Sequence, residues 1–417
     1  MTRRAQLEEL HRAALDAAHA GRALERAFAA SHPGEGPFVV LGAGKAACAI
    51  ADAAERVLGA RIRRGVVTTK LGHARALARC QVREASHPLP DENGEAAARE
   101  ALAIAESLVR DEELLVLLSG GASALWCAPA PGLSLADKRR VTELLLARDV
   151  DIRGLNTVRR HLSALKGGGL ARAARGRAVR AYAVSDVRGD RLEDLASGPV
   201  SPDPTHSGDA LSVLREHQLI DEVPRAVRAH LERGAGETAK PGDPALAKVD
   251  MRVIASLDVA LDAAVRRAES LGLRARVLRD ALYGEVESVA QSLASAARAA
   301  RRDGFALVVA GGEPTVRVRG PGRGGRAQEL ALRLALALEG ESDWHALCAG
   351  TDGTDGATDA AGAHSDATTL ARAAARGLDV RATLARSDSH PLLAALGDLY
   401  VTGPTDTNVA DLALVLV

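Results

Sequence analysis

The chain has 417 residues, of which 47% are hydrophobic and 26% charged, a composition typical of a globular protein with two or three domains. Its 54 Lys and Arg residues balance 54 Asp and Glu residues, so overall charge favours neither nucleic acid nor a membrane surface as a partner. Aromatic residues amount to 2%, too few for a base-stacking surface. No apolar run reaches the roughly 20 residues of a membrane helix, and the four cysteines form no C-x-x-C pair. We expect a cytoplasmic protein with reduced thiols, a monomer or a homodimer.

Short apolar runs alternate with amphipathic stretches, which predicts βαβ repetition and an α/β fold. Several runs are apolar throughout, as is typical of a parallel sheet covered on both faces. The expected strands are Phe38–Leu41, Gly65–Thr69, Leu114–Leu118, Arg180–Ser185, Met251–Ala255, Phe305–Ala310, Thr315–Arg319, Ala346–Ala349, Leu399–Thr402 and Leu412–Val417. The expected helices include Arg4–Ala29, Lys45–Leu58, Glu95–Val109, Leu135–Ala147, Leu257–Leu271, Glu285–Arg302 and Arg326–Leu338.

The stretch 221–250 contains HLERGAGETAKPGDPALAK, whose glycine, proline and charge are typical of a linker or a long exposed loop. We therefore expect an N-terminal α/β domain over residues 1–235 and a smaller C-terminal α/β domain over 236–417. Each glycine-rich cluster follows a predicted strand, and open α/β sheets bind ligands at the carboxyl ends of their strands. We expect these clusters on one rim, or on two rims facing one cleft.

The first cluster, FVVLGAGKAACAI, places Gly44 and Lys45 between a strand and a helix. Glycine allows a sharp turn, and a helix N-terminus beside a lysine attracts an anion. The loop also fits the loose dinucleotide pattern G-x-G-x-x-A, but the acidic residue expected about 20 residues later is missing, since the second strand ends at Thr69 and Lys70. It does not fit a Walker A loop. A tight turn with an exposed lysine is the alternative interpretation.

The second cluster places Ser119, Gly120, Gly121 and Ser123 directly after an apolar strand. Two hydroxyls among small residues suit a cradle for phosphate or carboxylate, and a turn of small residues is the alternative. A serine-hydrolase elbow is excluded, because the pattern G-x-S-x-G is absent.

The third cluster, LNTVRRHLSALKGGGLA, concentrates the donors Asn156, Arg159 and Lys166 before a glycine triplet that we expect to end a helix. This concentration suits an anionic ligand. A solvated basic face is the alternative.

The fourth cluster, AVSDVRGDRLEDLASGPVSPDPT, brings Asp186 and Asp190 to a strand end. Carboxylates in such places can hold Mg²⁺ or accept a proton from a substrate hydroxyl. Asp186 is the better candidate, because Asp190 also suits a turn or a cap.

The fifth cluster joins two strands through Glu313 and then opens a helix with GPGRGGR, which contains Arg323 and Arg326. Glycines and arginines at a helix N-terminus predict a polyanion site, with a flexible linker as the alternative.

The last two clusters are GTDGTDGATDAAGA, which contains Thr351 and Asp352, and TGPTDTNV, which contains Asn408. The first lacks the spacing and the terminal Glu of a calcium loop. Carboxylates at a strand end opposite cationic glycine loops fit a metal–phosphate site better.

Taken in order, these motifs resemble the class II glycerate 2-kinases, whose C-terminal part is the MOFRL domain. The resemblance covers nearly the whole chain and also includes SHPLPDENG at Ser86. It implies a Rossmann-like N-terminal α/β domain, a smaller MOFRL-type α/β domain and an active site in the cleft between them. It further implies phosphorylation of D-glycerate at the 2-hydroxyl with ATP and Mg²⁺.

Carried over by motif, Lys45 and Arg326 would hold substrate and phosphate, and Asp186 and Asp352 would be the catalytic or metal-associated carboxylates. The remaining residues expected to bind substrate or nucleotide are Gly44, Ser119, Gly120, Gly121, Ser123, Asn156, Arg159, Lys166, Asp190, Glu313, Arg323, Thr351 and Asn408. The sequence departs from the family pattern at Ala327, often Asn, at Asp406, usually Gly, and at Pro314 in GGEPTV. These departures bear on affinity and exact substrate more than on the reaction class.

Two other functions compete with this interpretation. A dehydrogenase acting on hydroxypyruvate would place a nicotinamide cofactor at Gly42–Ala47, but the missing acidic residue and the anion loops elsewhere argue against it. A sugar-acid-binding regulator would need a DNA-binding module, and no basic helix-turn-helix segment is apparent.

Overall fold

The computed structural model describes residues 1–234 and 236–417, and its contacts divide the chain into two compact units. The N-terminal unit is Ala20–Ile254, and the C-terminal unit combines Met1–His19 with Ala255–Val417. The expected domain boundary falls at residue 235, which lies outside the described residues.

The units divide between Ile254 and Ala255, because the preceding chain supplies strand β6 (Val249–Ala255) to the sheet of the N-terminal unit. The stretch interpreted as a linker is therefore part of a folded unit. It contains α10 (Arg225–Glu232), and Thr238 and Ala239 in it are buried.

The N-terminal unit is built on a six-stranded sheet in the order β3-β2-β1-β4-β5-β6. Strands β1 to β5 pair in parallel. This is the strand order of Rossmann folds, which confirms the Rossmann-like expectation, and the order reverses between β1 and β4. These strands are β1 (Phe38–Ala43), β2 (Ile62–Lys70), β3 (Cys80–Ala85), β4 (Glu113–Leu118) and β5 (Val179–Val184).

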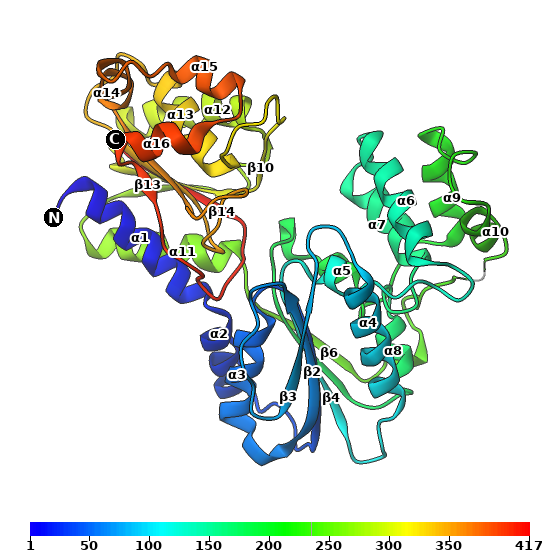
Figure 1. The fold of residues 1–417 in the computed structure, drawn as a ribbon. Helices are drawn as coiled ribbons and strands as arrows, with labels where there is room; N and C mark the ends of the chain where they lie inside the picture. Colours follow the sequence, from blue (N-terminus) through cyan, green and yellow to red (C-terminus); the bar gives the residue numbers. More distant parts are fainter. Residues whose placement is uncertain (235) are drawn as a thin grey trace. The chain divides into compact units, whose positions relative to one another are not determined.

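Strands β1 and β4 form the centre of this sheet, since every residue of β1 and nearly all of β4 is buried. Such strands need helices on both faces. Figure 1 shows α2 and α3 on one side of the sheet and α4 and α8 on the other. These helices are α2 (Ala20–Ala30), α3 (Ala47–Leu58), α4 (Glu92–Glu106) and α8 (Gly169–Ala173), and the short α5 (Ala122–Leu125) follows β4.

Four further helices of this unit group together in Figure 1 and enclose an apolar cluster of their own. They are α6 (Leu135–Ala147), α7 (Ile152–His161), α9 (Ser207–Glu216) and α10. Helix α7 starts at a defined place because the Asp151 carboxylate accepts a hydrogen bond from Gly154 N at 2.7 Å. Short 3₁₀ helices occur at Gly59–Arg61, Arg188–Asp190, Leu195–Ser197 and Pro244–Leu246.

The C-terminal unit has a six-stranded sheet in the order β13-β12-β11-β14-β9-β7. Only β7 and β9 pair in parallel, whereas the other neighbours are antiparallel. The expectation of a parallel sheet is therefore wrong for this unit, because apolar strands show that both faces are covered and not which way the strands run. The strands are β7 (Ala275–Leu278), β9 (Leu307–Gly312), β11 (His345–Gly350), β12 (Gly362–Asp366), β13 (Leu399–Tyr400) and β14 (Asp411–Leu416).

The strand expected at Thr315–Arg319 is also wrong. Only β10 (Pro314–Thr315) forms there, paired with β8 (Gly284–Glu285). The partner strand is two residues long, so the following residues, Arg317–Arg319, have no ladder to join and are exposed.

Helices cover both faces of the C-terminal sheet, and Figure 1 shows α1 and α11 opposite α12 and α13. The expected single helix Arg4–Ala29 is two helices, because His19, with ψ of 118°, breaks it, and its halves belong to different units. The helices of this unit are α1 (Arg3–Ala18), α11 (Leu257–Ser270), α12 (Val286–Arg302), α13 (Arg326–Ala337), α14 (Thr369–Ala375), α15 (Val380–Ala385) and α16 (Ser389–Leu396).

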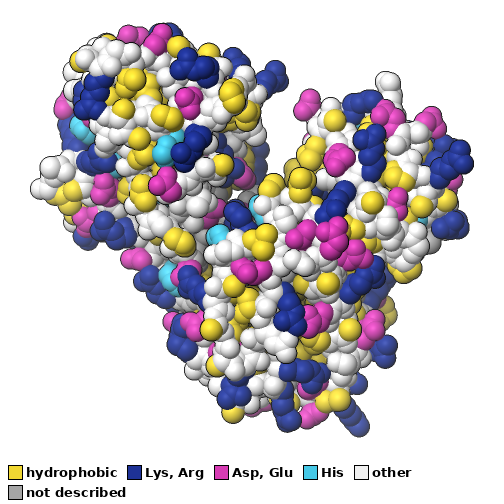
Figure 2. Space-filling view, in the orientation of Figure 1, with side chains coloured by type: hydrophobic (Ala, Val, Ile, Leu, Met, Phe, Trp, Pro, Cys, Tyr) yellow, Lys and Arg dark blue, Asp and Glu magenta, His cyan; other side chains and the backbone are white. Residues whose placement is uncertain are grey.

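Charge is mixed on the molecular surface. On the face drawn in Figure 2, Lys and Arg side chains alternate with Asp and Glu, as the balanced composition predicts. Among the described residues, none of the helices is long and apolar enough to cross a membrane.

Candidate active site

The loops after β1 and β4 interlock where the strand order reverses. Lys45 N donates a hydrogen bond to Gly120 O at 2.9 Å, and Ala46 N donates to Ser119 Oγ at 3.0 Å. Gly44 has φ of 134°, and a Cβ there would lie 2.1 Å from Ser119 Oγ, so only glycine permits this approach. The first two motifs thus meet at the carboxyl ends of two adjacent strands.

Lys45 is half-buried in this loop pair. A Cβ on Gly121 would lie 3.5 Å from Lys45 Cγ and 3.1 Å from His87 Cδ2, so both side chains flank that glycine. His87 was not among the expected site residues. It lies within the SHPLPDENG motif, which is the signal that could have found it.

A chain of side-chain hydrogen bonds joins the second, third and fourth motifs. Ser123 Oγ and Ser197 Oγ are 2.9 Å apart, and Ser197 Oγ donates to Asn156 Oδ1 at 3.4 Å. Asn156 Nδ2 donates to Asp194 Oδ1 at 3.3 Å. The structure therefore brings Ser123 and Asn156 together through Ser197. The chain ends at Asp194, which sequence reasoning missed.

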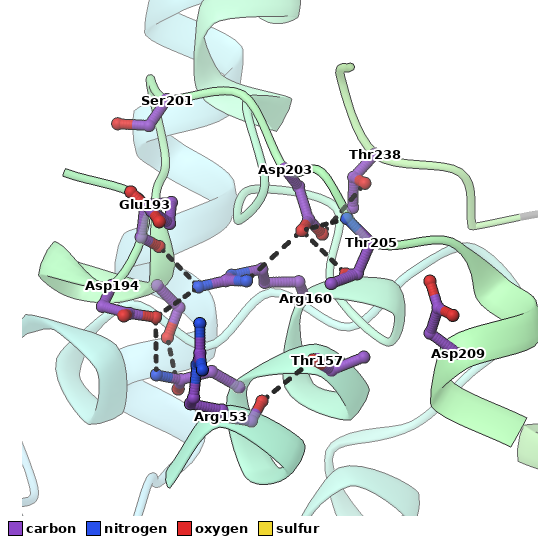
Figure 3. Close-up of polar contacts among 12 residues, drawn as sticks. Arg153, Thr157, Arg160, Glu193, Asp194, Ser201, Asp203, Thr205, Asp209 and Thr238 are labelled. Atoms are coloured by element: carbon purple, nitrogen blue, oxygen red, sulfur yellow. Dashed lines mark hydrogen bonds and ion pairs between the residues drawn. The ribbon is translucent and has the colours of Figure 1, made fainter. Parts of the chain in front are cut away.

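Arg160 has a structural role in this region, which Figure 3 shows in detail. Its guanidinium donates to Asp194 Oδ1 at 2.6 Å, to Asp203 Oδ1 at 3.3 Å and to the carbonyl oxygen of Glu193 at 2.8 Å. Asp203 also accepts from Thr238 Oγ1 at 3.0 Å. Arg160 thus ties α7 to the chain that follows β5, and two carboxylates neutralise it.

Lys166 lies between α7 and α8, and its Nζ donates to Ser123 O at 2.9 Å. Burial, reinforced by neighbouring positive charges, lowers the pKa of Lys166 well below its usual value. The expectation that the glycine triplet ends a helix is wrong, because α7 ends at His161 and α8 begins at Gly169. The glycines are needed for packing instead: a Cβ on Gly168 would lie 2.5 Å from the Ala239 Cβ.

The two aspartates after β5 differ in setting. Asp186 lies two residues beyond the strand and is half-buried. Asp190 has φ of 51°, and its N–H donates to Val187 O at 3.0 Å, which is turn geometry. Asp186 therefore remains the better candidate for chemistry.

In the C-terminal unit, Arg326 is the first residue of α13 and is held by two carboxylates. Its Nε and one terminal nitrogen donate to the two Asp411 oxygens at 2.6 Å and 3.0 Å, and the other terminal nitrogen pairs with Glu313. Burial raises the pKa of Asp411 to about 7, although Arg326 opposes the shift. Burial alone lowers the pKa of Arg326, but Asp411 and Glu313 outweigh that effect and raise it. Asp411, the first residue of β14, was not expected in the site.

Two backbone donors at the N-terminus of α13 are engaged within the fold and are not free for the polyanion expected at the fifth motif. The buried Asp355 carboxylate accepts from Ala327 N at 3.1 Å and from Gln328 N at 2.8 Å. A Cβ on Gly325 would lie 2.2 Å from Asp355 Cγ. The glycines thus admit an internal carboxylate, and Arg326 remains the candidate anion-binding group of this motif.

The sixth and seventh motifs pack together beside Arg326. A Cβ on Gly353 would lie 2.0 Å from Gly403 O, so the two loops touch through backbone. Asp352 is half-buried and accepts from Thr354 N at 3.0 Å. A Cβ on Gly350 would lie 3.3 Å from Asp411 Oδ1 and 3.6 Å from Asp352 Oδ1, so both carboxylates flank this glycine.

Three other residues expected to bind substrate or nucleotide are Thr351, Arg323 and Asn408. Thr351 is buried, and its hydroxyl donates to Ala410 O at 2.7 Å and accepts from Val409 N at 2.8 Å, so it shapes the loop. Arg323 is exposed, and its N–H donates to the Asp388 carboxylate at 2.9 Å. Asn408 is buried.

The structure shows the surroundings of two residues that depart from the family pattern, Asp406 and Ala327. Asp406 has φ of 59°, a left-handed conformation that explains a usual glycine and that aspartate tolerates. Ala327 is buried in the apolar cluster beneath α12 and α13.

The described residues contain no group of three or more His, Cys, Asp or Glu side chains that could hold a metal ion by themselves. Mg²⁺ in nucleotide sites is often held by one or two carboxylates plus substrate phosphates. Asp186 in the N-terminal unit and Asp352 in the C-terminal unit each have a half-buried carboxylate, the ligand type that such binding uses.

Comparison with known proteins places the chain among a recognised group. The model of a domain of unknown function, DUF4147, matches residues 6–232, and that of the MOFRL family matches residues 306–411. A glycerate 2-kinase from Pyrococcus horikoshii is 39% identical over 92% of this chain and 88% of its own. A protein from Agrobacterium vitis, provisionally named a hydroxypyruvate reductase, is 41% identical over 92% of this chain and 87% of its own. The solved structure of a glycerate kinase from Thermotoga maritima matches with a TM-score of 0.88 and 37% identity, covering 98% of each chain.

Proposed function

The chain belongs to the class II glycerate kinase family, and from that premise we propose that it transfers the γ-phosphoryl group of ATP to the 2-hydroxyl of D-glycerate. The products are 2-phosphoglycerate and ADP. The observation that carries the proposal is that the motif loops gather into two clusters, one in each unit. One centres on Lys45 between β1 and β4, and the other on Arg326 beside Asp352.

The cations have the role of binding anionic groups of the two substrates. Phosphoryl transfer depends on positioning and on offsetting the charge that develops on the phosphoryl oxygens. Lys45, on a glycine loop at the reversal of strand order, suits a phosphate. Arg326 is oriented by its ion pairs with Asp411 and Glu313. The proposal requires both residues to act on the same pair of substrates.

The carboxylates have the complementary role of handling the hydroxyl and the metal. Asp186 accepts or orients the proton of the 2-hydroxyl, and Asp352 helps to hold Mg²⁺ together with the phosphates. Mg²⁺, when bound, would offset the negative charge of the phosphates. The assignment of Asp186 rests on its half-buried place two residues after β5.

A reductase that uses a nicotinamide cofactor is the rival, given the name of the relative from Agrobacterium vitis. A dinucleotide ribose needs an acidic residue near the end of β2. That strand ends in Thr68, Thr69 and Lys70, and the Thr68 hydroxyl already accepts from the buried Trp126 Nε1 at 3.0 Å. Lys70, the cation at the end of β2, suits a phosphate group better than the two hydroxyls of a ribose.

Two assays on the same preparation separate these functions. We expect ADP release that requires both D-glycerate and Mg²⁺, and no oxidation of NADH or NADPH with hydroxypyruvate. Reduced-cofactor oxidation without ADP release would overturn the proposal. Light scattering tests the remaining expectation of a monomer or homodimer, and cell fractionation tests a cytoplasmic location.

A further inference from the structure

A group of cations in the N-terminal unit gathers around Cys127. This cation cluster consists of Lys138, Arg159 and Lys166. Lys138 and Lys166 meet at one loop, because Lys138 Nζ and Ser163 Oγ both donate to Ala128 O, at 3.4 Å and 3.2 Å, and Ser163 Oγ accepts from Lys166 N at 3.3 Å. The positive charge of Arg159 acts on both lysines. The exposed fractions are 5% for Lys138, 3% for Lys166 and 4% for Cys127, whereas Arg159 is half-buried.

The two lysines of the cation cluster donate hydrogen bonds only to uncharged groups among the described residues. Lys138 Nζ donates to Ala128 O at 3.4 Å, and Lys166 Nζ donates to Ser123 O at 2.9 Å and Ala196 O at 3.5 Å. These acceptors are neutral carbonyl groups. Within residues 1–234 and 236–417, no carboxylate forms an ion pair with any member of the cluster.

The nearby carboxylates are engaged by other arginines. Glu95, which acts weakly on Lys138, pairs with Arg99 at 2.7 Å. Asp194 and Asp203 both pair with Arg160, as Figure 3 shows. Two adjacent residues of α7 thus contrast: Arg160 is neutralised within the fold, and Arg159 is not.

Burying a positive charge without a negative partner costs folding free energy, so buried cations in proteins are normally paired with an anion. Burial lowers the pKa of Lys138 and of Lys166, and mutual repulsion within the cluster adds to the effect. An incoming anion offsets both costs. Arg159, the member that keeps some exposure, lies on the solvent side.

We propose that Lys138, Arg159 and Lys166 form an anion subsite that receives a carboxylate or phosphoryl group of a substrate. Lys138 and Cys127 thereby join a site that the motifs alone did not assign them to. The identity of the ligand, D-glycerate or ATP, rests on the proposed function, whereas the existence of an anion subsite does not. The subsite adjoins the Ser123–Ser197–Asn156 chain, because Lys166 is held by the Ser123 carbonyl.

The test compares Lys138→Met and Lys166→Met, which keep the length of the aliphatic stem and remove the charge, with Lys248→Met at an exposed lysine of the same unit. Calorimetry measures the binding of D-glycerate, ATP, inorganic phosphate and uncharged glycerol to each protein without turnover. We expect at least a tenfold weaker Kd for D-glycerate or for ATP and phosphate, with the control unchanged. Loss for D-glycerate alone assigns the carboxylate, and loss for ATP and phosphate assigns the phosphoryl group.

Thermal unfolding of the ligand-free proteins provides a second readout. Removal of an uncompensated cation leaves Tm unchanged or raises it, whereas removal of a structural cation lowers it. If either lysine variant fails to fold, Arg159→Met at the half-buried position carries the same binding test. Wild-type affinity for all three anions in the folded variants overturns the subsite, whatever the activity of the wild type. Wild-type protein that binds anions through the cluster but releases no ADP leaves the subsite intact and overturns the proposed function.

Discussion

The two units surround their candidate ligand-binding cations in opposite ways. In the C-terminal unit, Arg326 is held by Asp411 and Glu313, so its charge is oriented and compensated before any ligand arrives. In the N-terminal unit, Lys138 and Lys166 are more deeply buried and have only neutral acceptors. The first arrangement favours precise orientation, and the second favours capture of an anion. Substitutions should therefore separate stability from activity differently in the two units.

The largest expected effect is that of Arg326→Ala. Loss of a preorganised charge-stabilising group lowers kcat/KM by about 10³-fold. It also leaves Asp411 buried without its partner, which costs about 2 kcal/mol of unfolding free energy, less than in a fully buried pair because Arg326 is partly exposed.

A double variant sharpens this prediction. Arg326→Ala/Asp411→Asn should recover most of the lost stability and none of the activity, as measured by urea unfolding and ADP release. Exposed Arg302→Ala serves as the control. Activity near that of the wild type in Arg326→Ala would remove Arg326 from the site.

Lys45→Ala should have a large effect on activity and little effect on stability, because the lysine is only half-buried and the loop is held by backbone contacts. We expect kcat/KM to fall by about 10²-fold or more through loss of a charge-assisted phosphate contact. Steady-state kinetics beside exposed Lys248→Ala measure this effect. An equal loss in both variants contradicts a specific role for Lys45.

Substitution of the two candidate carboxylates, Asp186 and Asp352, should change different kinetic properties. Asp186→Asn should lower kcat by about 10²-fold, the scale of lost general-base catalysis, without changing the Mg²⁺ requirement. Asp352→Asn should mainly raise the Mg²⁺ concentration needed for half-maximal rate. Mg²⁺ titrations of both variants test the assignment, and the reverse pattern exchanges the two roles.

The last expected effect concerns the pH dependence of stability. Burial raises the pKa of Asp411 from its ordinary value near 4 to about 7 in the folded protein. Between these values the folded state holds a proton that the unfolded chain has lost, so this contribution to stability is complete below about pH 4 and is lost as pH rises through about 7.

Urea unfolding from pH 4 to 8 measures this contribution as the difference between wild type and Asp411→Asn. The wild type should lose unfolding free energy relative to the variant as pH rises. A difference that is constant across this range contradicts the raised pKa.

The sequence predicted the N-terminal unit better than the C-terminal one, for physical reasons. Glycine loops such as Gly44–Lys45 mark the ends of strands. Parallel strands bring their carboxyl ends to one rim of the sheet, so the sequence predicts that these loops lie close together. In the C-terminal sheet, β11 and β14 have the apolar composition typical of parallel strands, but they pair antiparallel. Apolar composition reports coverage of both faces and carries no information on direction.

Two residues that sequence reasoning missed, Asp411 and Asp355, share one property: their partners are far away in sequence. Asp411 begins a strand and pairs with Arg326, 85 residues earlier. Asp355 caps a helix that begins before it, and neither contact leaves a local pattern. The break at His19 was missed for the same reason, since the two halves of an apparently continuous helix pack in different units.

The central claim is that phosphate is transferred to one particular hydroxyl of D-glycerate. ³¹P NMR of a reaction of wild-type protein with D-glycerate, ATP and Mg²⁺ tests it most directly, with product identity fixed by added standards of 2- and 3-phosphoglycerate. The account predicts a growing 2-phosphoglycerate resonance that matches ADP formation and is lost in Lys45→Ala. Appearance of 3-phosphoglycerate would contradict the position of transfer, and ATP that stays intact in the presence of D-glycerate would contradict the kinase reaction itself.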